Sequence, residues 1–143
     1  MARDLGHARL EAIVLCNLGI VHGELGETDT ARAHCEAALL LTRELGDRRL
    51  EGQLHGYLGT LLGRARRFAE ARSHLGRGSE RLRELADTLD LGVLLCGRAE
   101  TEWLSGDADA ARAALAEAAR VTRQSELGVA LERATSLVGG NPA

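Results

Sequence analysis

The chain has almost no aromatic residues, a single proline and no lysine. Aromatic side chains make up 2% of its 143 residues, and Tyr57, Phe68 and Trp103 are the only ones. A hydrophobic core must therefore come mainly from leucine, alanine and valine, which suits helices that pack closely through small side chains. The one proline is Pro142, so no proline interrupts a helix before the tail.

The composition gives no support for binding to nucleic acid, for association with a membrane or for secretion. The net charge of −3 gives no reason to expect nucleic acid or an anionic membrane surface. No apolar run approaches the roughly 20 residues of a membrane-spanning helix, and the first residues do not form a secretion signal. Cys16, Cys35 and Cys96 are an odd number without metal-site spacing, which indicates a reduced setting. We therefore expect a cytoplasmic protein. The length of the chain predicts one domain over 1–143.

The residue patterns that carry chemistry are also missing from the sequence. Five histidines are present, but no two of them are spaced by one helical turn, as two metal ligands on one helical face would be. We find no phosphate loop, no Ser-His-Asp arrangement and no paired carboxylates in a predicted pocket. The sequence therefore predicts no enzyme, no metal site and no cofactor.

What the chain does contain is a repetition with a step of forty residues. The pair Leu18-Gly19 recurs as Leu58-Gly59. Three alanine–arginine pairs and three single arginines keep the same step; the pairs begin at Ala31, Ala71 and Ala111, and the single arginines are Arg43, Arg83 and Arg123. A fixed period of about 20–50 residues is typical of stacked repeat proteins, in which no unit buries its apolar face alone. Such proteins usually present a surface to a partner, so we expect a binding module.

Apolar residues recur at the helical spacings of three and four. They predict hairpins over 8–25 with 29–45, 48–65 with 68–84, and 88–104 with 107–123, within repeats of about 8–45, 48–85 and 88–124. Gly26 and Gly106 lie where the first and third hairpins turn, whereas Arg66 occupies that place in the second. A lone helix over about 126–138, with Ala134 and Leu137 on its apolar face, is expected to cap the stack.

The first residues repeat the boundary between two units. Residues 4–11 copy residues 44–51 almost one for one, and residues 44–46 are expected to close a hairpin. We infer that residues 2–6 are the end of a further hairpin and that the chain is a piece of a longer array. An uncovered first helix would then associate with another, which predicts a homodimer through exposed terminal helices.

The repeated positions resemble the tetratricopeptide repeat over roughly residues 8–124. The first unit reads Leu15-x-x-Leu18-Gly19-x-x-His22, then Ala31-x-x-x-Cys35. The second reads His55-x-x-Leu58-Gly59-x-x-Leu62 with Phe68, then Ala71-x-x-x-Leu75. The third keeps Ala111-x-x-x-Leu115 and Ala118 but has Arg98-Ala99 in place of the Leu-Gly pair.

The ordinary unit of that family has about 34 residues. The longer unit here is similar to the subtype found in kinesin light chains, spindle-orientation scaffolds and repeat arrays of bacterial signalling ATPases and kinases. The resemblance implies a right-handed α-solenoid of three hairpins plus the C-terminal capping helix. It also implies that the first helices line a concave groove, which a protein partner enters as an extended peptide or a helix. From the net charge we expect no nucleic acid and no membrane as partners.

Residues on the free face of each first helix are the candidates for contact with that partner. We predict the groove residues Asn17, Ile20, Glu24, Gln53, Tyr57, Thr60, Arg64, Glu100 and Trp103. The resemblance implies that the amide of Asn17 pairs with a peptide backbone; an exposed or locally bonded asparagine is the alternative. Tyr57 and Trp103 are the expected aromatic anchors, and Trp103 could equally fill space between units two and three.

Arginines outnumber acidic residues between 64 and 83. They form either a cationic patch for an acidic partner or a solvated face, and the solvated face is favoured. The sequence thus predicts a protein–protein interaction module, as part of a larger signalling or regulatory protein. The alternatives are self-assembly and an effector-sensing regulatory region of a multidomain ATPase or kinase.

Overall fold

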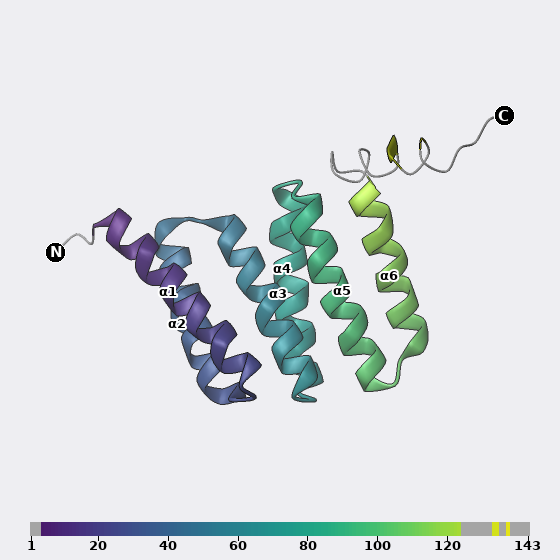
Figure 1. Cartoon of the computed structure of the whole chain (residues 1–143), viewed down its shortest axis with the longest axis horizontal. Coiled ribbons are helices and arrows are strands. Elements are labelled where there is room, and N and C mark those ends of the chain that lie inside the picture. Colours follow the sequence, from purple (N-terminus) through teal and green to yellow (C-terminus); the bar gives the residue numbers. More distant parts are fainter. Residues whose placement is uncertain (1–3, 124–132, 135–136, 138–143) are drawn as a thin grey trace.

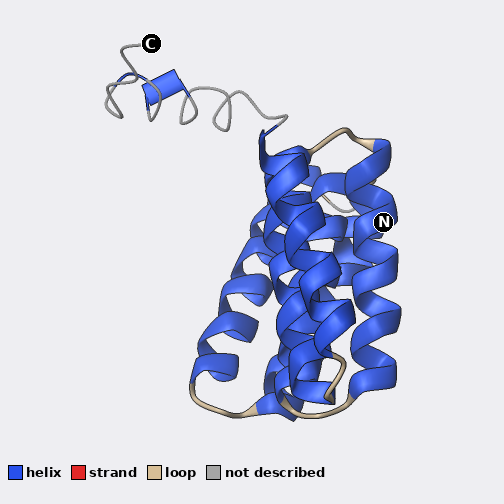
Figure 2. Ribbon diagram, turned by 90° about the vertical axis from the view of Figure 1, so that its right-hand side faces the viewer, coloured by secondary structure: helices blue, strands red, loops and turns tan. Residues whose placement is uncertain are grey.

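Three helical hairpins stand in a row. The computed structural model describes residues 4–123, 133–134 and 137. Within 4–123 it contains α1 (Leu5–Glu24), α2 (Thr28–Leu45), α3 (Arg48–Arg64), α4 (Phe68–Glu84), α5 (Thr88–Ser105) and α6 (Ala108–Arg123). Consecutive helices pair as hairpins that stack side by side (Figure 1), and a view along the row shows them overlapping (Figure 2). No strand occurs among the described residues, which confirms the predicted all-α solenoid.

Helix α1 begins earlier than the repeat predicts. The carboxylate of Asp4 accepts a hydrogen bond of 3.0 Å from the backbone N–H of Gly6, which caps the helix and lets it start at Leu5. Residues 5–7 therefore form the first turn of α1. This start lies three residues before the predicted one at residue 8, so the predicted boundary of this helix is wrong.

The turns follow the forty-residue step and explain where glycine is needed. Gly26 and Gly106 follow α1 and α5 with φ values of 78° and 94°, in the left-handed region. Arg66 adopts the same conformation after α3, with φ of 63°, although a Cβ makes this region unfavourable. Gly46 and Ala86 form a second such pair between hairpins, with φ of 67° and 53°. The turn geometry is thus kept even where the glycine is absent.

Small residues let the two helices of a hairpin approach closely. An ideal Cβ on Gly19 would lie 2.5 Å from the sulfur of Cys35, and one on Gly59 would lie 2.4 Å from Cγ of Leu75. Ala31 and Ala71 are fully buried at the facing positions. These positions therefore serve the packing of the two helices of a hairpin.

The core runs between hairpins as well as within them. One cluster joins α2 to α3 and consists of Cys35, Ala38, Leu39, Leu54 and Leu58. A second joins α4, α5 and α6 and consists of Leu75, Leu82, Leu91, Leu94, Leu95, Ala118 and Val121. Each new first helix therefore packs on the preceding hairpin. Helices α3 and α5 lie side by side, and Tyr57 of α3 reaches the Gly19 carbonyl of α1.

Only three residues of the predicted capping helix, 126–138, are described. Residues 133, 134 and 137 are helical, and the side chains of Ala134 and Leu137 are exposed. The predicted burial of these two side chains is therefore not observed. The rest of that segment lies outside the described residues.

Candidate functional site

A groove of about 620 Å³ lies across the first helices of the three hairpins. It is bounded by the end of α1, by α3 and by α5. Six of the predicted residues line it, namely Glu24, Gln53, Tyr57, Thr60, Arg64 and Glu100. The structure therefore brings residues from all three units together around one concavity.

Three predicted residues lie outside this groove. Asn17 is exposed on α1 and does not line it. Ile20 is also partly exposed on α1. Trp103 is 65% exposed on α5, so it does not fill the space between the second and third hairpins. None of the three shares the groove with the other six.

Tyr57 ties α3 to α1. Its hydroxyl donates to the carbonyl of Gly19 at 3.2 Å, and an ideal Cβ on Gly23 would lie 2.3 Å from the hydroxyl oxygen. Burial raises the pKa of Tyr57 to about 12. The ring is thus part of the groove wall and is held by the neighbouring repeat, which leaves its hydroxyl occupied.

The equivalent residue in the third unit, Gly97, allows α5 to approach α3. An ideal Cβ on Gly97 would lie 2.0 Å from the hydroxyl oxygen of Thr60, which itself donates to the carbonyl of Gly56 at 3.0 Å. Asn17, Tyr57 and Gly97 occupy one repeat position, and in the last two units this position serves the contact between repeats. This packing gives a physical reason why the asparagine is not repeated.

Two polar contacts cross the groove from α3 to α5. The guanidinium of Arg64 donates to both carboxylate oxygens of Glu100, at 2.8 and 3.1 Å. This pair of hydrogen bonds is the main reason why the pKa of Arg64 is raised above its ordinary value. The side-chain amide of Gln53 donates to the carboxylate of Asp90 at 2.8 Å.

Asp90 is a groove residue that the sequence analysis missed. Forty and eighty residues earlier, the same repeat position holds Leu50 and Leu10. A carboxylate at an otherwise apolar position was the signal that could have revealed it. Burial, followed by the neighbouring Asp87, raises the pKa of Asp90. Burial thus disfavours the charged form of this carboxyl, and the neighbouring Asp87 adds to that effect.

The groove therefore carries more acidic than basic groups. Glu24, Asp90 and Glu100 line it, against Arg64 as the one guanidinium among the described lining residues. Because Arg64 is already paired with Glu100, the remaining charge is negative. This favours cationic groups at the groove.

Several of the arginines between 64 and 83 connect neighbouring helices. Arg72 forms two hydrogen bonds with the carboxylate of Glu102, at 2.8 and 3.0 Å, and Arg67 lies 3.0 Å from a carboxylate oxygen of Asp29. Arg83 pairs with Glu117 in the following hairpin. Arginines that are neutralised in this way link repeats to one another, and they do not offer an open cationic patch to an acidic partner.

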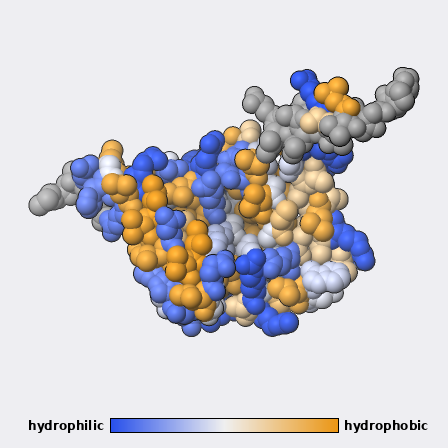
Figure 3. Space-filling view, viewed as in Figure 1, coloured by the Kyte–Doolittle hydropathy of each residue, from blue (hydrophilic) through white to orange (hydrophobic). Residues whose placement is uncertain are grey.

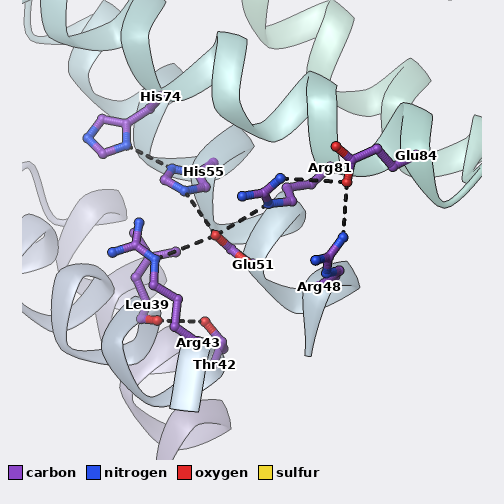
Figure 4. A network of polar contacts seen from close by, with 9 residues as sticks. All are labelled: Leu39, Thr42, Arg43, Arg48, Glu51, His55, His74, Arg81 and Glu84. Carbon is purple, nitrogen blue, oxygen red and sulfur yellow. Dashed lines mark hydrogen bonds and ion pairs between the residues drawn. The ribbon is translucent and has the colours of Figure 1, made fainter. Parts of the chain in front are cut away.

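A second polar cluster lies inside the stack. His55 is fully buried, and its Nδ1 lies 3.0 Å from Nδ1 of His74 (Figure 4). Its Nε2 faces Glu51 at 3.9 Å, and that carboxylate also lies near Arg43 and Arg81. Burial is the main cause that lowers the pKa of His55 to about 4. Among the described residues, no group of three or more potential ligands could hold a metal ion.

Over the same part of the chain, no helix is long and apolar enough to cross a membrane. A search of curated proteins and a search of solved structures found no significant match. A family model for the tetratricopeptide repeat matches residues 10–84, which hold nearly all of the first two hairpins. This match covers more than half of the 143 residues of the chain. The chain therefore belongs to the tetratricopeptide repeat family, whose repeats generally mediate protein–protein interaction.

Proposed function

We propose that the groove between α1, α3 and α5 binds a segment of a partner protein, either extended or helical. The observation that carries this proposal is the concavity of about 620 Å³ to which first helices of three successive hairpins contribute. The lining includes Gly52, Gly56 and Gly97, and the space that a Cβ would need at these positions is filled by Leu82, Leu94 and Thr60 of the chain itself.

The groove combines apolar contact area with a polar rim, as protein-binding sites do. Val93 of α5 lines it and is 67% exposed, so its side chain is available to a partner. Burying a side chain of this kind contributes about 1.5 kcal/mol or more to binding. Val93 is thus the apolar contact for which the proposal expects the largest effect.

The charge of the groove supports a basic partner segment. Glu24 is exposed at the end of α1, and the Asp90 carboxylate accepts from an uncharged amide. An arginine of the partner would donate two parallel hydrogen bonds to such a carboxylate. We therefore propose a segment that combines a small apolar side chain with at least one arginine or lysine.

A displayed library of random peptides tests this function, followed by affinity measurements on the selected peptides. Val93→Arg and Glu24→Arg should each weaken binding about tenfold or more, which corresponds to about 1.4 kcal/mol. Leu89→Arg is the matched control, because Leu89 is half exposed on the same helix and does not line the groove. Selected peptides that bind all three variants as tightly as the parent chain would refute the proposed site.

A second candidate function is the sensing of a small effector as part of a larger signalling protein. The groove volume favours it, because small-molecule sites typically measure about 300–1,000 Å³. A thermal-shift screen with a metabolite library separates the two functions. Stabilisation that Val93→Arg abolishes, together with an empty peptide selection, would favour effector sensing.

A further inference from the structure

Helix α1 carries an apolar face that nothing covers in the described part of the chain. Five side chains form it, and we call them the α1 stripe: Leu10, Val14, Leu18, Val21 and Leu25. They are 63%, 55%, 38%, 55% and 66% exposed. Their spacing of four, four, three and four residues keeps them on one side of the helix. Figure 3 shows the resulting orange band on the left of the molecule, where α1 lies.

The same repeat positions are covered in the next unit. Leu54 and Leu58, forty residues after Val14 and Leu18, are fully buried, and Leu61 is 8% exposed. Leu54 and Leu58 belong to the cluster that packs on Cys35, Ala38 and Leu39 of α2. This position of the repeat is therefore a helix-packing surface within the stack, and in α1 the same surface is exposed.

None of the α1 stripe residues lines the groove, and α1 packs within its own hairpin through others. Its buried residues are Ala8, Ala12 and Gly19, and Tyr57 of α3 reaches the carbonyls of Gly19 and Ile20. A partner on the α1 stripe would consequently leave these contacts in place.

The exposed area points to association with another chain. From their exposed fractions, the five side chains present on the order of 500 Å² of apolar surface, at the upper end for one patch on a monomer. Two such faces in contact would bury on the order of 1,000 Å² in total, which is the lower range for a specific interface. A second copy supplies a face of matching size and chemistry.

The order of residues in the α1 stripe is compatible with an antiparallel contact. It reads leucine, valine, leucine, valine, leucine, and its spacing is nearly unchanged when the direction is reversed. An antiparallel contact places Leu10 opposite Leu25 of a second copy and Val14 opposite Val21 of that copy. Contacts between identical surfaces of this kind are those of a two-fold dimer.

We propose that this chain forms a two-fold symmetric homodimer in which the α1 stripes of two copies pack against each other in antiparallel orientation. The dimer is independent of the proposed groove function, because it uses another face of α1. Each dimer would present two separate grooves.

Sedimentation velocity of the full chain, from about 1 to about 200 µM, tests the dimer. The parent chain should be dimeric at the upper concentrations, and Val14→Arg and Val21→Glu should each raise the dimer dissociation constant at least tenfold. Leu40→Arg, at an exposed leucine of α2 outside the stripe, should leave it unchanged. Leu10→Gln, which adds no charge, should also weaken the dimer, and circular dichroism verifies that each variant is folded.

Mixing the two charged variants, Val14→Arg and Val21→Glu, tests the orientation. In the antiparallel dimer the introduced arginine of one copy would face the introduced glutamate of the other copy. An equimolar mixture should therefore regain association to within a few-fold of the parent chain. A parent chain that stays monomeric to the highest concentration would overturn the proposal, and would indicate that a different helical segment covers this face. A dimer that survives Val14→Arg, or a mixture that remains monomeric, would overturn it as well.

Discussion

The buried histidine of α3 makes folding stability depend on pH. His55 is 1% exposed, and burial, together with nearby His74 and Arg43, lowers its pKa to about 4. In the unfolded chain the pKa of a histidine is about 6.5. Below that pH the unfolded chain takes up a proton that the folded chain excludes. Stability is therefore fully present above pH 6.5 and is lost as the pH falls toward about 4.

The size of this loss follows from the two pKa values. One pKa unit corresponds to about 1.4 kcal/mol, so lowering the pH from 7.5 to 5 should cost about 2 kcal/mol of unfolding free energy at this site. His74 at 3.0 Å contributes to the lowered pKa of His55, because the two rings cannot both be protonated at that distance without repulsion. Glu51, at 3.9 Å from His55, opposes it in part.

Leucine is the natural replacement for measuring this effect. The repeat positions equivalent to His55 hold Leu15 in α1 and Leu95 in α5, so His55→Leu restores what the other two units use. Urea unfolding followed by far-ultraviolet circular dichroism at pH 7.5, 6.5, 5.5 and 5 compares this variant with the parent chain and with His7→Leu, at an exposed histidine. The difference between parent and His55→Leu should change by about 2 kcal/mol across that range. A difference that stays constant with pH would refute the assigned protonation of His55.

Further predictions concern the turns, the helix contacts and one ion pair. Arg66→Gly should raise the midpoint of urea unfolding by the equivalent of about 1 kcal/mol, because φ is 63° at this position; an unchanged or lower midpoint would contradict the turn argument. Gly59→Ala should destabilise the chain by about 1–3 kcal/mol, since a leucine carbon would lie 2.4 Å from the new Cβ. Gly76→Ala, with no heavy atom within 4 Å, should instead stabilise it by about 0.5–1 kcal/mol in the same assay, and effects of equal sign would show that space does not decide them. Glu102→Gln should cost about 1–2 kcal/mol in thermal unfolding through its two hydrogen bonds with Arg72, and a neutral result would mean that the pair contributes nothing to the stack.

The repeat period predicts the fold closely because the two helices of each hairpin pack on each other in all three units. Asp47 and Asp87, one step apart, both accept a hydrogen bond from the backbone N–H three residues later and cap α3 and α5. The start of α1 was missed because Asp4 provides a cap that lies outside this register. A local side chain decided that boundary, and the periodicity carries no information about it.

The groove was harder to predict, because the sequence gives the face of a helix but not the distance to the next helix. Tyr57 lies on the predicted face, but because Gly23 has no side chain, the Tyr57 hydroxyl can pack against α1. Trp103 was predicted to lie on the same face, but its side chain is exposed and lies outside the groove. Asp90 was overlooked because its position is apolar in the other two units.

In the proposed function, a partner segment lies across the first helices of the hairpins. Amide chemical shifts of the isotope-labelled chain, recorded while a peptide selected from the library is added, test it most directly. We expect shifts at the groove glycines Gly52, Gly56 and Gly97, with Gly76 on the second helix α4 unchanged. Shifts confined to α2, α4 and α6, with the three groove glycines unmoved, would contradict it.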